Sequence, residues 1–343
     1  MKPRHLLILR FSSLGDIAMT VPVIRQLLQQ HPSLVVTMVS VEWVRPLFEN
    51  IDRLHFYAAD IRGRHKGVMG LKKLAAELKA TIKFDAVADL HDVLRTKMLR
   101  FFLSFSRKPI HVIDKGRAEK KELTRQHHKK LQPLKSTFQR YADVFERLGF
   151  PVSLQPGEVI LQLPLEPGLL KLKQEGFQLV GIAPFALHEE KTYPPERMRE
   201  VIRMLAGPPR LKIFLLGGKK EAAILEEWAA QSTQVQSWAG KMDLKNELKH
   251  IAMLDVVVSM DSANMHLASL FGVPVVSIWG GTHPFLGFYG WGQDPANAVQ
   301  VDLDCRPSSV FGNKTCHNQG ACLKMISPVM IYEKITGVLK SPA

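Results

Sequence analysis

The stretch LLILRFSSLGDI, residues 6–17, indicates how the first half of the chain folds. Its start is apolar apart from Arg10 and predicts a buried strand over residues 6–11. Small residues follow, and Gly15 permits a tight turn. A helix is predicted over residues 17–30. This succession is typical of the strand–turn–helix unit of a parallel α/β fold.

The same alternation of short apolar runs and amphipathic patterns continues along the chain. Two series of βαβ units are therefore predicted, each forming a parallel sheet. In the first series the further strands are 35–39, 54–57, 86–90 and 110–113, and the further helices are 71–82, 94–104 and 136–148. In the second series the strands are 179–183, 212–216, 256–259, 275–279 and 299–301, and the helices are 195–205, 221–230, 244–253, 265–271 and 328–339.

A length of 343 residues is more than one hydrophobic core usually serves. Residues 149–167 contain four prolines, which suits a connection between domains, with a short strand expected at 159–163. We expect a Rossmann-like domain over residues 1–160, a second over 161–327 and a terminal helix over 328–343. Ligands of doubly wound sheets bind beyond the carboxyl ends of the strands, so a central cleft between the facing domains is expected.

The net charge of +14 is concentrated in one half of the chain. Residues 1–164 hold 28 Lys/Arg against 15 Asp/Glu, and residues 165–343 hold 18 against 17. A field of this kind attracts nucleic acid, an anionic membrane surface or an acidic substrate. It is also compatible with a solvated basic face that serves only solubility.

The sequence predicts a cytoplasmic protein, because no apolar run reaches the roughly 20 residues of a spanning helix and the N-terminal run lacks the features of a signal peptide. The three cysteines, Cys305, Cys316 and Cys322, are an odd number for a disulfide framework. They lack the close pairs of most structural zinc sites, so no metal site is predicted.

Two polar turns follow predicted strands and carry acidic residues. Asp16 is either a helix N-cap or a general base at the end of the first strand. In the stretch 256–268, Asp261 is likewise a candidate N-cap. Backbone amides at residues 262–264, with His266 one turn later, could bind an anion at a helix N-terminus.

Two further turns follow strands of the second series. WGGTHP, residues 279–284, has two glycines that allow close backbone approach to a ligand, and Thr282 could donate to a phosphate oxygen. Lys191, in the stretch 183–196, is a candidate cation for a leaving diphosphate. Neither a P-loop nor a G-x-G-x-x-G fingerprint after the first strand is present, which disfavours an NTPase or a dehydrogenase.

Taken in order, these motifs resemble those of glycosyltransferase family 9, the lipopolysaccharide heptosyltransferases. The resemblance is carried by S-S-L-G-D at 12–16, K-T-Y-P at 191–194, L-G-G-x-x-E at 216–221, D-S-A-x-x-H at 261–266 and G-x-T-x-P at 280–284. It spans nearly the whole chain. Tyr193 stands where the family usually has Trp, and Ser308 replaces the second cysteine of a C-x-P-C pair found in many relatives.

The resemblance implies a GT-B fold, in which the terminal helix over 328–343 is expected to cross back onto the first domain. It also implies an inverting, metal-independent enzyme without a cofactor, which transfers heptose from ADP-heptose to the lipopolysaccharide inner core. It implies that Asp16 is the catalytic base and that Lys191 contacts the diphosphate. Nucleotide-sugar contacts are expected from Ser13, Gly15, Gly217, Gly218, Glu221, Asp261, Ser262, Ala263, His266, Gly280 and Thr282.

The acceptor that the resemblance implies is acidic and anchored in a membrane, which suits the basic first half of the chain. We expect acceptor contacts from two basic segments after strand ends, and peripheral contact with the anionic cytoplasmic face of the inner membrane. The expected residues are Arg62, Arg64, Lys66, Lys115, Arg117, Lys120 and Lys121.

Three other functions fit parts of the sequence. One is another sugar-nucleotide enzyme with two Rossmann-like domains, such as one with a different donor or an epimerase. A second is a nucleic-acid-binding protein, although no recognised module is present and the basic residues are not interleaved with stacking aromatics. The third is a non-catalytic paralogue, against which the presence of Asp16 and Lys191 argues.

Overall fold

The computed structural model describes residues 4–157, 159–314 and 321–340. The chain divides into two compact units. Unit 1 comprises residues 1–115 and 137–155, and unit 2 comprises residues 116–136 and 156–343. The basic segment that follows Lys115 therefore groups with unit 2, and the chain returns to unit 1 at Thr137.

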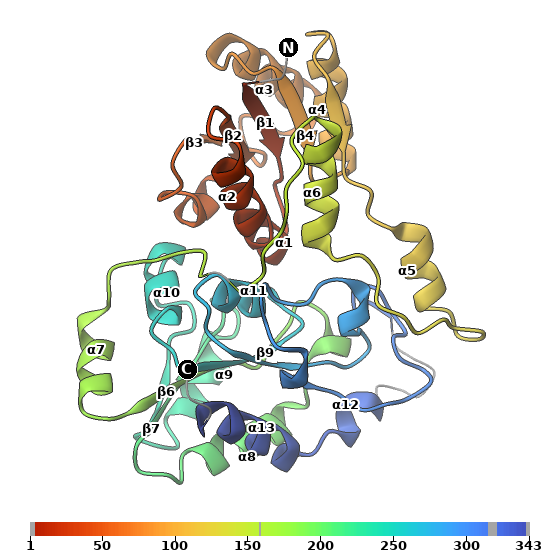
Figure 1. The fold of residues 1–343 in the computed structure, drawn as a ribbon. Helices are drawn as coiled ribbons and strands as arrows, with labels where there is room; N and C mark the ends of the chain where they lie inside the picture. The colour runs from red at the N-terminus through yellow and green to blue at the C-terminus, as the bar shows by residue number, and fades with distance from the viewer. Residues whose placement is uncertain (1–3, 158, 315–320, 341–343) are drawn as a thin grey trace. The chain divides into compact units, whose positions relative to one another are not determined.

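Unit 1 is built on a five-stranded parallel sheet in the order β3-β2-β1-β4-β5 (Figure 1). The β1 strand is completely buried from Leu6 to Leu9, as expected for a parallel sheet covered on both faces. The strands are β1 (His5–Leu9), β2 (Val35–Ser40), β3 (Leu54–Ala58), β4 (Ala86–Asp89) and β5 (Ile110–Val112). The helices are α1 (Leu14–Ala18), α2 (Thr20–Gln30), the 3₁₀ helix η1 (Glu42–Leu47), α3 (Gly67–Thr81), α4 (Leu94–Ser104) and α6 (Thr137–Arg147).

Unit 2 has a six-stranded parallel sheet in the order β11-β10-β9-β6-β7-β8. Its strands are β6 (Gln178–Ala183), β7 (Leu211–Leu215), β8 (Val235–Ser237), β9 (Val256–Met260), β10 (Val275–Ile278) and β11 (Ala298–Val299). Its α-helices are α5 (Arg117–Leu123), α7 (Pro167–Gln174), α8 (Pro195–Leu205), α9 (Ala222–Ala229), α10 (Leu244–Ile251), α11 (Ala263–Ser269), α12 (Ala321–Met325) and α13 (Pro328–Lys340), and its 3₁₀ helices are η2 (Glu189–Lys191), η3 (Pro284–Leu286) and η4 (Pro295–Asn297).

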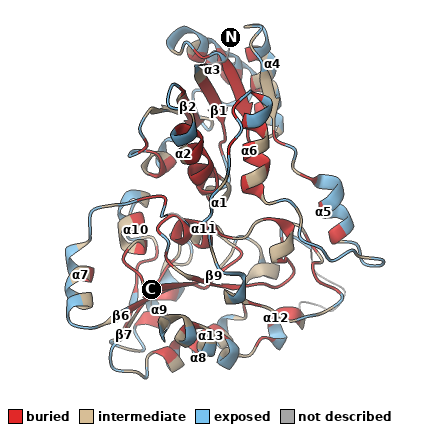
Figure 2. Ribbon diagram, in the orientation of Figure 1, coloured by how far each residue is buried: buried red, intermediate tan, exposed pale blue. Residues whose placement is uncertain are grey.

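These two sheets confirm the predicted α/β class with two parallel-sheet domains. Figure 2 shows that their strands are largely buried while the outer faces of the helices are exposed. In each sheet the chain starts near the middle, builds outward to one edge, and then returns to build the other half. This order is that of a doubly wound fold, in which the strand order reverses at one point.

The structure differs from the expected elements in several details. The helix expected at 17–30 is divided into α1 and α2 and begins earlier, at Leu14, because Ser13 is its N-cap. No strand forms among the described residues of 159–163. Instead, the N–H groups of Ile160 and Leu161 both donate to Leu270 O, at 2.9 Å. The short β8 strand and the helices α5, α7 and α12 were not predicted.

The last helix, α13, packs within unit 2. Ile331 and Ile335 are completely buried in the core of that unit, and α13 contacts α8 and the strands β9, β10 and β11. We expected this helix to cross back onto the first domain. The structure instead groups it with unit 2, because its apolar face completes that core.

We predict that α13 is required for the stability of unit 2. Replacing both Ile331 and Ile335 with Ala should destabilise the protein by several kcal/mol, because deleting a buried isoleucine side chain typically costs about 2–5 kcal/mol. Val329→Ala, at a position that is 47% exposed on the same helix, is the matched control and should change the stability little. Urea unfolding of the three proteins tests this, and equal stability of the double variant and the control would contradict it.

Candidate functional sites in the two units

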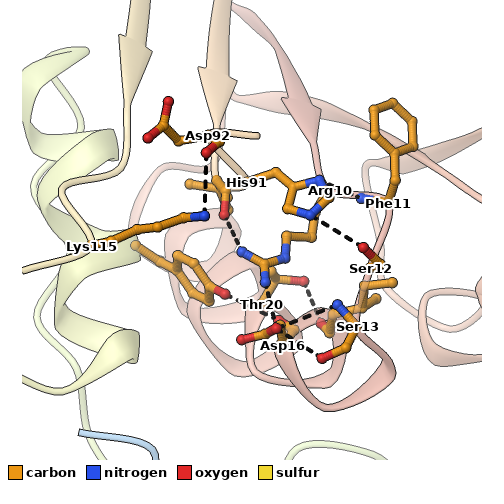
Figure 3. Close-up of polar contacts among 12 residues, drawn as sticks. Arg10, Phe11, Ser12, Ser13, Asp16, Thr20, His91, Asp92 and Lys115 are labelled. Carbon is orange, nitrogen blue, oxygen red and sulfur yellow. Dashed lines mark hydrogen bonds and ion pairs between the residues drawn. The ribbon is translucent and has the colours of Figure 1, made fainter. Parts of the chain in front are cut away.

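The site in unit 1 lies where the strand order reverses. The β1 and β4 strands are neighbours in the sheet, but they lead into connections that build opposite halves of it. Asp16 lies in the first turn of α1, just after β1, and His91 and Asp92 lie just after β4. Figure 3 shows these side chains gathered with Arg10 and Lys115. Such reversal points are the usual ligand-binding positions of doubly wound folds.

Three donors fix the orientation of the Asp16 carboxylate. Its Oδ2 lies 2.6 Å from Nη2 of Arg10, accepts the Ser13 hydroxyl at 2.8 Å and accepts the Ser13 N–H at 3.3 Å. The Arg10 side chain is 6% exposed and that of Asp16 is 30% exposed. Asp16 therefore occupies the third helical position and not the N-cap, although its contact with the Ser13 N–H still satisfies a backbone donor at the helix start.

The partners of Asp16 are themselves held by neighbouring segments. Arg10 donates to Leu90 O after β4, and the buried Tyr141 hydroxyl of α6 donates to the backbone carbonyl of Asp16 at 3.2 Å. The α1 turn is thus tied to segments that are distant in sequence. A partly exposed carboxylate held in this way can accept a proton from a bound hydroxyl group.

His91 is a neutral hydrogen-bonding residue of this site. Burial, together with the charge of Arg10, lowers the pKa of His91 to about 3. Its Nδ1 accepts the Phe11 N–H at 3.4 Å, so in the neutral ring the proton is on Nε2. Nε2 then donates to the Ser12 hydroxyl at 3.3 Å, which connects the turn after β1 to the segment after β4.

The basic residues expected to contact an acceptor have different surroundings. In the loop after β3, Arg62 and Lys66 are exposed, whereas Arg64 is paired with Glu77 of α3. Hydrogen bonding from Arg64 lowers the pKa of Glu77 to about 2. The buried His65 also contacts Glu77, at 3.0 Å, so this loop is anchored to α3.

The remaining four expected acceptor residues do not form one group. Lys115 belongs to unit 1 and donates to Asp92 O at 3.3 Å. Arg117, Lys120 and Lys121 belong to α5 of unit 2. Lys120 is only 7% exposed, and its Nζ lies 4.1 Å from the centre of the Phe288 ring, whereas Arg117 and Lys121 are exposed.

The site in unit 2 also lies where the strand order reverses, beyond the neighbouring strands β6 and β9. Lys191, at the end of η2, forms an ion pair of 2.9 Å with Asp261, which follows β9. The side chains are 16% and 6% exposed. Ser262, and not Asp261, is the N-cap of α11, so the alternative assignment of Asp261 as a helix cap was wrong. His266 lies on α11 and is 7% exposed.

The loop after β10 lies beside η2. The Gly281 N–H donates to Glu190 O at 3.3 Å, so the loop and Lys191 are neighbours. A Cβ atom at Gly280 would lie 2.5 Å from Leu323 Cγ and 2.9 Å from Glu190 O, which explains the requirement for glycine. Thr282 is completely buried, and among the described residues its hydroxyl has no hydrogen-bond partner.

Arg306 holds this loop in place. Its guanidinium donates to the carbonyl oxygens of Gly280, at 2.7 Å, and Thr282, at 3.0 Å, and to the side-chain oxygen of Gln300 at 3.0 Å. Arg306 is 3% exposed, and burial lowers its pKa. Fixed glycine-rich backbone at a strand end, beside a lysine, is an arrangement that can bind a phosphate group.

Of the other expected nucleotide-sugar residues, Gly217, Gly218 and Glu221 lie in the turn after β7, whereas Ser13 and Gly15 lie at the start of α1 in unit 1. Glu221 accepts the Gly218 N–H at 2.8 Å in the turn after β7. A Cβ atom at Gly217 would lie 2.8 Å from Leu225 Cδ1, so the glycine permits close packing against α9. Glu221 and Gly217 therefore shape the turn.

Sequence reasoning missed Arg10, His91, Tyr141, Arg306 and Gly312 as site residues. Arg306 was noted only as part of an altered cysteine motif, and nothing in its local sequence indicates that it contacts both the loop after β10 and the segment after β11. Gly312 lies against Lys191, whose Cγ would be 2.3 Å from a Cβ at that position. An arginine within an otherwise apolar strand, as at Arg10, was the one available signal.

Some sequence-based predictions concern metals, cysteines and membranes. Among the described residues, no group of three His, Cys, Asp or Glu is arranged to hold a metal ion. Cys305 and Cys322 are buried, and Cys316 lies outside the described residues. None of the described helices has the length and apolar character needed to cross a membrane.

Comparison with known proteins gives consistent results. The chain is 24% identical to lipooligosaccharide heptosyltransferase 2 of Campylobacter jejuni over 332 residues, covering 94% of this chain and 95% of the relative. A glycosyltransferase family 9 structure from Veillonella parvula has a TM-score of 0.74 at 20% identity and covers 98% of both chains. E. coli heptosyltransferase WaaC with ADP has a TM-score of 0.69 at 19% identity, covering 97% of this chain and 99% of that one.

The likeness to these solved structures shows the GT-B fold that the sequence motifs implied. The family model of glycosyltransferase family 9 (heptosyltransferase) matches residues 71–317, which is more than half of the chain. The chain therefore belongs to glycosyltransferase family 9, the heptosyltransferase family, and is a glycosyltransferase.

Proposed function

We propose that this enzyme transfers a heptose from ADP-heptose to the inner core of lipopolysaccharide, with inversion at the anomeric carbon and without a metal ion. The observation that carries the proposal is the Asp16 carboxylate, which is partly exposed and oriented by Arg10 and Ser13. Family membership and the relatives support the choice of sugar: one solved relative, WaaC, holds ADP, and a second WaaC structure holds ADP-2-deoxy-2-fluoro heptose.

In the proposed reaction, Asp16 accepts the proton of the acceptor hydroxyl group while its oxygen attacks the anomeric carbon of the donor. The bond from that carbon to the diphosphate breaks in the same step. A single displacement of this kind inverts the configuration at the carbon. The contacts of Asp16 support this role, because they hold the carboxylate before the acceptor arrives.

Unit 2 is proposed to bind the nucleotide sugar. The leaving ADP gains negative charge, which Lys191, Thr282 and His266 would stabilise together with the amides of residues 262–264. The buried Thr282 hydroxyl supports this assignment, because a diphosphate oxygen would give it the partner that the described residues do not supply. Gly217, Gly218 and Glu221 are proposed to shape the nucleotide-binding turn.

The acceptor is proposed to contact basic residues of the loop after β3 and of the segment after β5, which includes α5. Arg62, Lys66, Arg117 and Lys121 are exposed and suit direct contact with phosphate or carboxylate groups. Arg64 contacts Glu77 and Lys120 contacts Phe288, so these two residues suit a role in positioning the loop after β3 and the helix α5. The enzyme would act from the cytoplasmic face of the inner membrane, where such a lipid acceptor is accessible.

The wild-type enzyme should transfer heptose from ADP-heptose to core lipid that lacks heptose, and should do so equally well in EDTA. The reason is that Lys191 and the donors near it are proposed to stabilise the negative charge on the leaving ADP, which is the role that a metal ion would otherwise have. Product mass measured with ADP-, UDP- and GDP-sugars, with and without EDTA, tests both points. Activity lost in EDTA and restored by Mg²⁺ or Mn²⁺ would contradict the metal-independent mechanism, and transfer only from another nucleotide sugar would contradict the donor.

Asp16→Asn should lower the transfer rate by roughly 10²–10⁴-fold, the usual contribution of a general base, while the affinity for ADP stays unchanged. Ser13→Ala is the matched control, because it removes one donor to Oδ2 and keeps the carboxylate and its ion pair with Arg10. Its rate should fall much less. If Asp16→Asn keeps full turnover and only loses thermal stability, Asp16 is a structural residue of the α1 turn.

Lys191→Met should weaken ADP binding by about tenfold or more, since a hydrogen bond between charged groups contributes about 1.5–3 kcal/mol. It should also destabilise the protein by roughly 3 kcal/mol, because Asp261 is left buried without its cation. Adding Asp261→Asn should restore most of the stability and none of the ADP affinity. Calorimetry and thermal unfolding of both proteins separate the two effects, and restored ADP binding in the double variant would show that Lys191 only neutralises Asp261.

A further inference from the structure

One face of α4 carries large apolar side chains that are open to solvent. Leu94, Phe101 and Phe105 are 77%, 56% and 68% exposed. Together with the exposed Lys97 they follow the helical repeat, so they share one side of the helix. The ring centres of Phe101 and Phe105 are 5.3 Å apart. These four residues are called the α4 face below.

The opposite side of α4 already has its packing partners. Leu99 and Leu103 are completely buried in the core of unit 1. The exposed apolar residues are therefore not needed to attach the helix to its own unit. The helix therefore has two apolar sides, one packed against the core and one exposed to solvent. An exposed apolar cluster of this kind marks an interaction surface.

The exposed charges of α4 and of the neighbouring α3 have one sign. Residues 94–113 include five Lys/Arg and no Asp or Glu. Arg100 is paired with Asp89 and Asp92 at the sheet edge, whereas Lys97 and Arg107 are exposed. The neighbouring helix α3 adds the exposed Lys72, Lys73 and Lys79.

We propose that the α4 face docks unit 1 onto the surface of an anionic lipid bilayer. Phenyl and leucyl side chains would enter the boundary between headgroups and acyl chains, and the flanking cations would bind the anionic headgroups. The helix has 11 residues, about half of what crossing the hydrocarbon layer requires, so it would lie in the plane of the membrane surface. The inference rests on the proposed function only in that a lipid-anchored acceptor explains why the enzyme meets a membrane.

Charge selects the bilayer over the other possible occupant, a second copy of the chain. Packing two α4 faces together would bring Lys97 and Arg107 of one copy near the same cations of the other, and like charges disfavour that contact. An anionic lipid surface instead complements every exposed charge of the segment. It also tolerates the irregular outline of the apolar side chains, because acyl chains adapt to it.

Sedimentation of the full chain with vesicles that contain no acceptor tests the proposal. The wild-type protein should bind vesicles containing phosphatidylglycerol and bind pure phosphatidylcholine vesicles much more weakly. Replacing Phe101 and Phe105 together with Ser should lower the partition onto phosphatidylglycerol vesicles by at least tenfold. Trp43→Ser is the matched control, because Trp43 is a 54% exposed aromatic residue of unit 1 outside the α4 face, and it should bind like the wild type.

The charge arm uses Lys97→Glu, which should lower binding by about tenfold at low salt and less at high salt. Lys171→Glu, on α7 of unit 2 with a 76% exposed side chain, should leave binding unchanged. All variants should keep the wild-type melting temperature and ADP affinity, which shows that the substitutions act only at the surface.

The proposal is overturned if the wild type does not prefer phosphatidylglycerol vesicles, if the Phe101/Phe105 variant binds them normally, or if Trp43→Ser loses as much binding. It is also overturned if the wild type is a dimer that the double variant dissociates, since the α4 face would then be a self-association surface. No donor sugar is present in this assay. Failure of heptose transfer would therefore refute the proposed function and leave the membrane result standing.

Discussion

The reversal of strand order in each sheet fixes where the enzyme can place functional groups. At β1 and β4 in unit 1, and at β6 and β9 in unit 2, neighbouring strands lead into connections that run in opposite directions. No crossover helix covers the carboxyl ends of such a strand pair, so the turns there remain accessible. Asp16 follows β1, and Lys191 and Asp261 follow β6 and β9. The same topological constraint thus locates the carboxylate of one unit and the cation of the other.

Buried arginines make these accessible turns rigid. Parallel strands end at one edge, where backbone carbonyls leave the ladder and need other donors. Arg10 joins the turn after β1 to Leu90 after β4, and Arg306 joins the loop after β10 to residues 300 and 301 after β11. One guanidinium has five donors in a fixed plane, so it can bind several carbonyls at once. The order that these arginines impose is what allows a carboxylate or a glycine turn to be held ready before ligands bind.

The sequence predicted the parts of the molecule that depend on local pattern. Buried runs such as Leu6–Leu9 and Val256–Val258 could be recognised as strands, and Gly280 as a position of close backbone approach. The two doubly wound units followed from their alternation with helices. Contacts between residues distant in sequence could not be predicted in the same way. Arg306 shows its role only through partners from two other segments, Lys120 is buried against Phe288, and α13 belongs to the core of unit 2. The start of α1 lies earlier than predicted because Ser13, and not Asp16, is the N-cap.

The Lys191–Asp261 ion pair is relevant to the role proposed for Lys191, which is to bind the leaving diphosphate. A lysine that is 16% exposed would lose much of its hydration without an anion nearby. The Asp261 carboxylate compensates for the lost hydration of the Lys191 ammonium group and also holds its Nζ atom in place. A carboxylate carries less charge than a leaving diphosphate, so the lysine can gain interaction energy as negative charge grows on the leaving group. Stabilisation that increases along the reaction is the part of binding that accelerates it, because contacts of equal strength in the ground state and the transition state do not change the barrier.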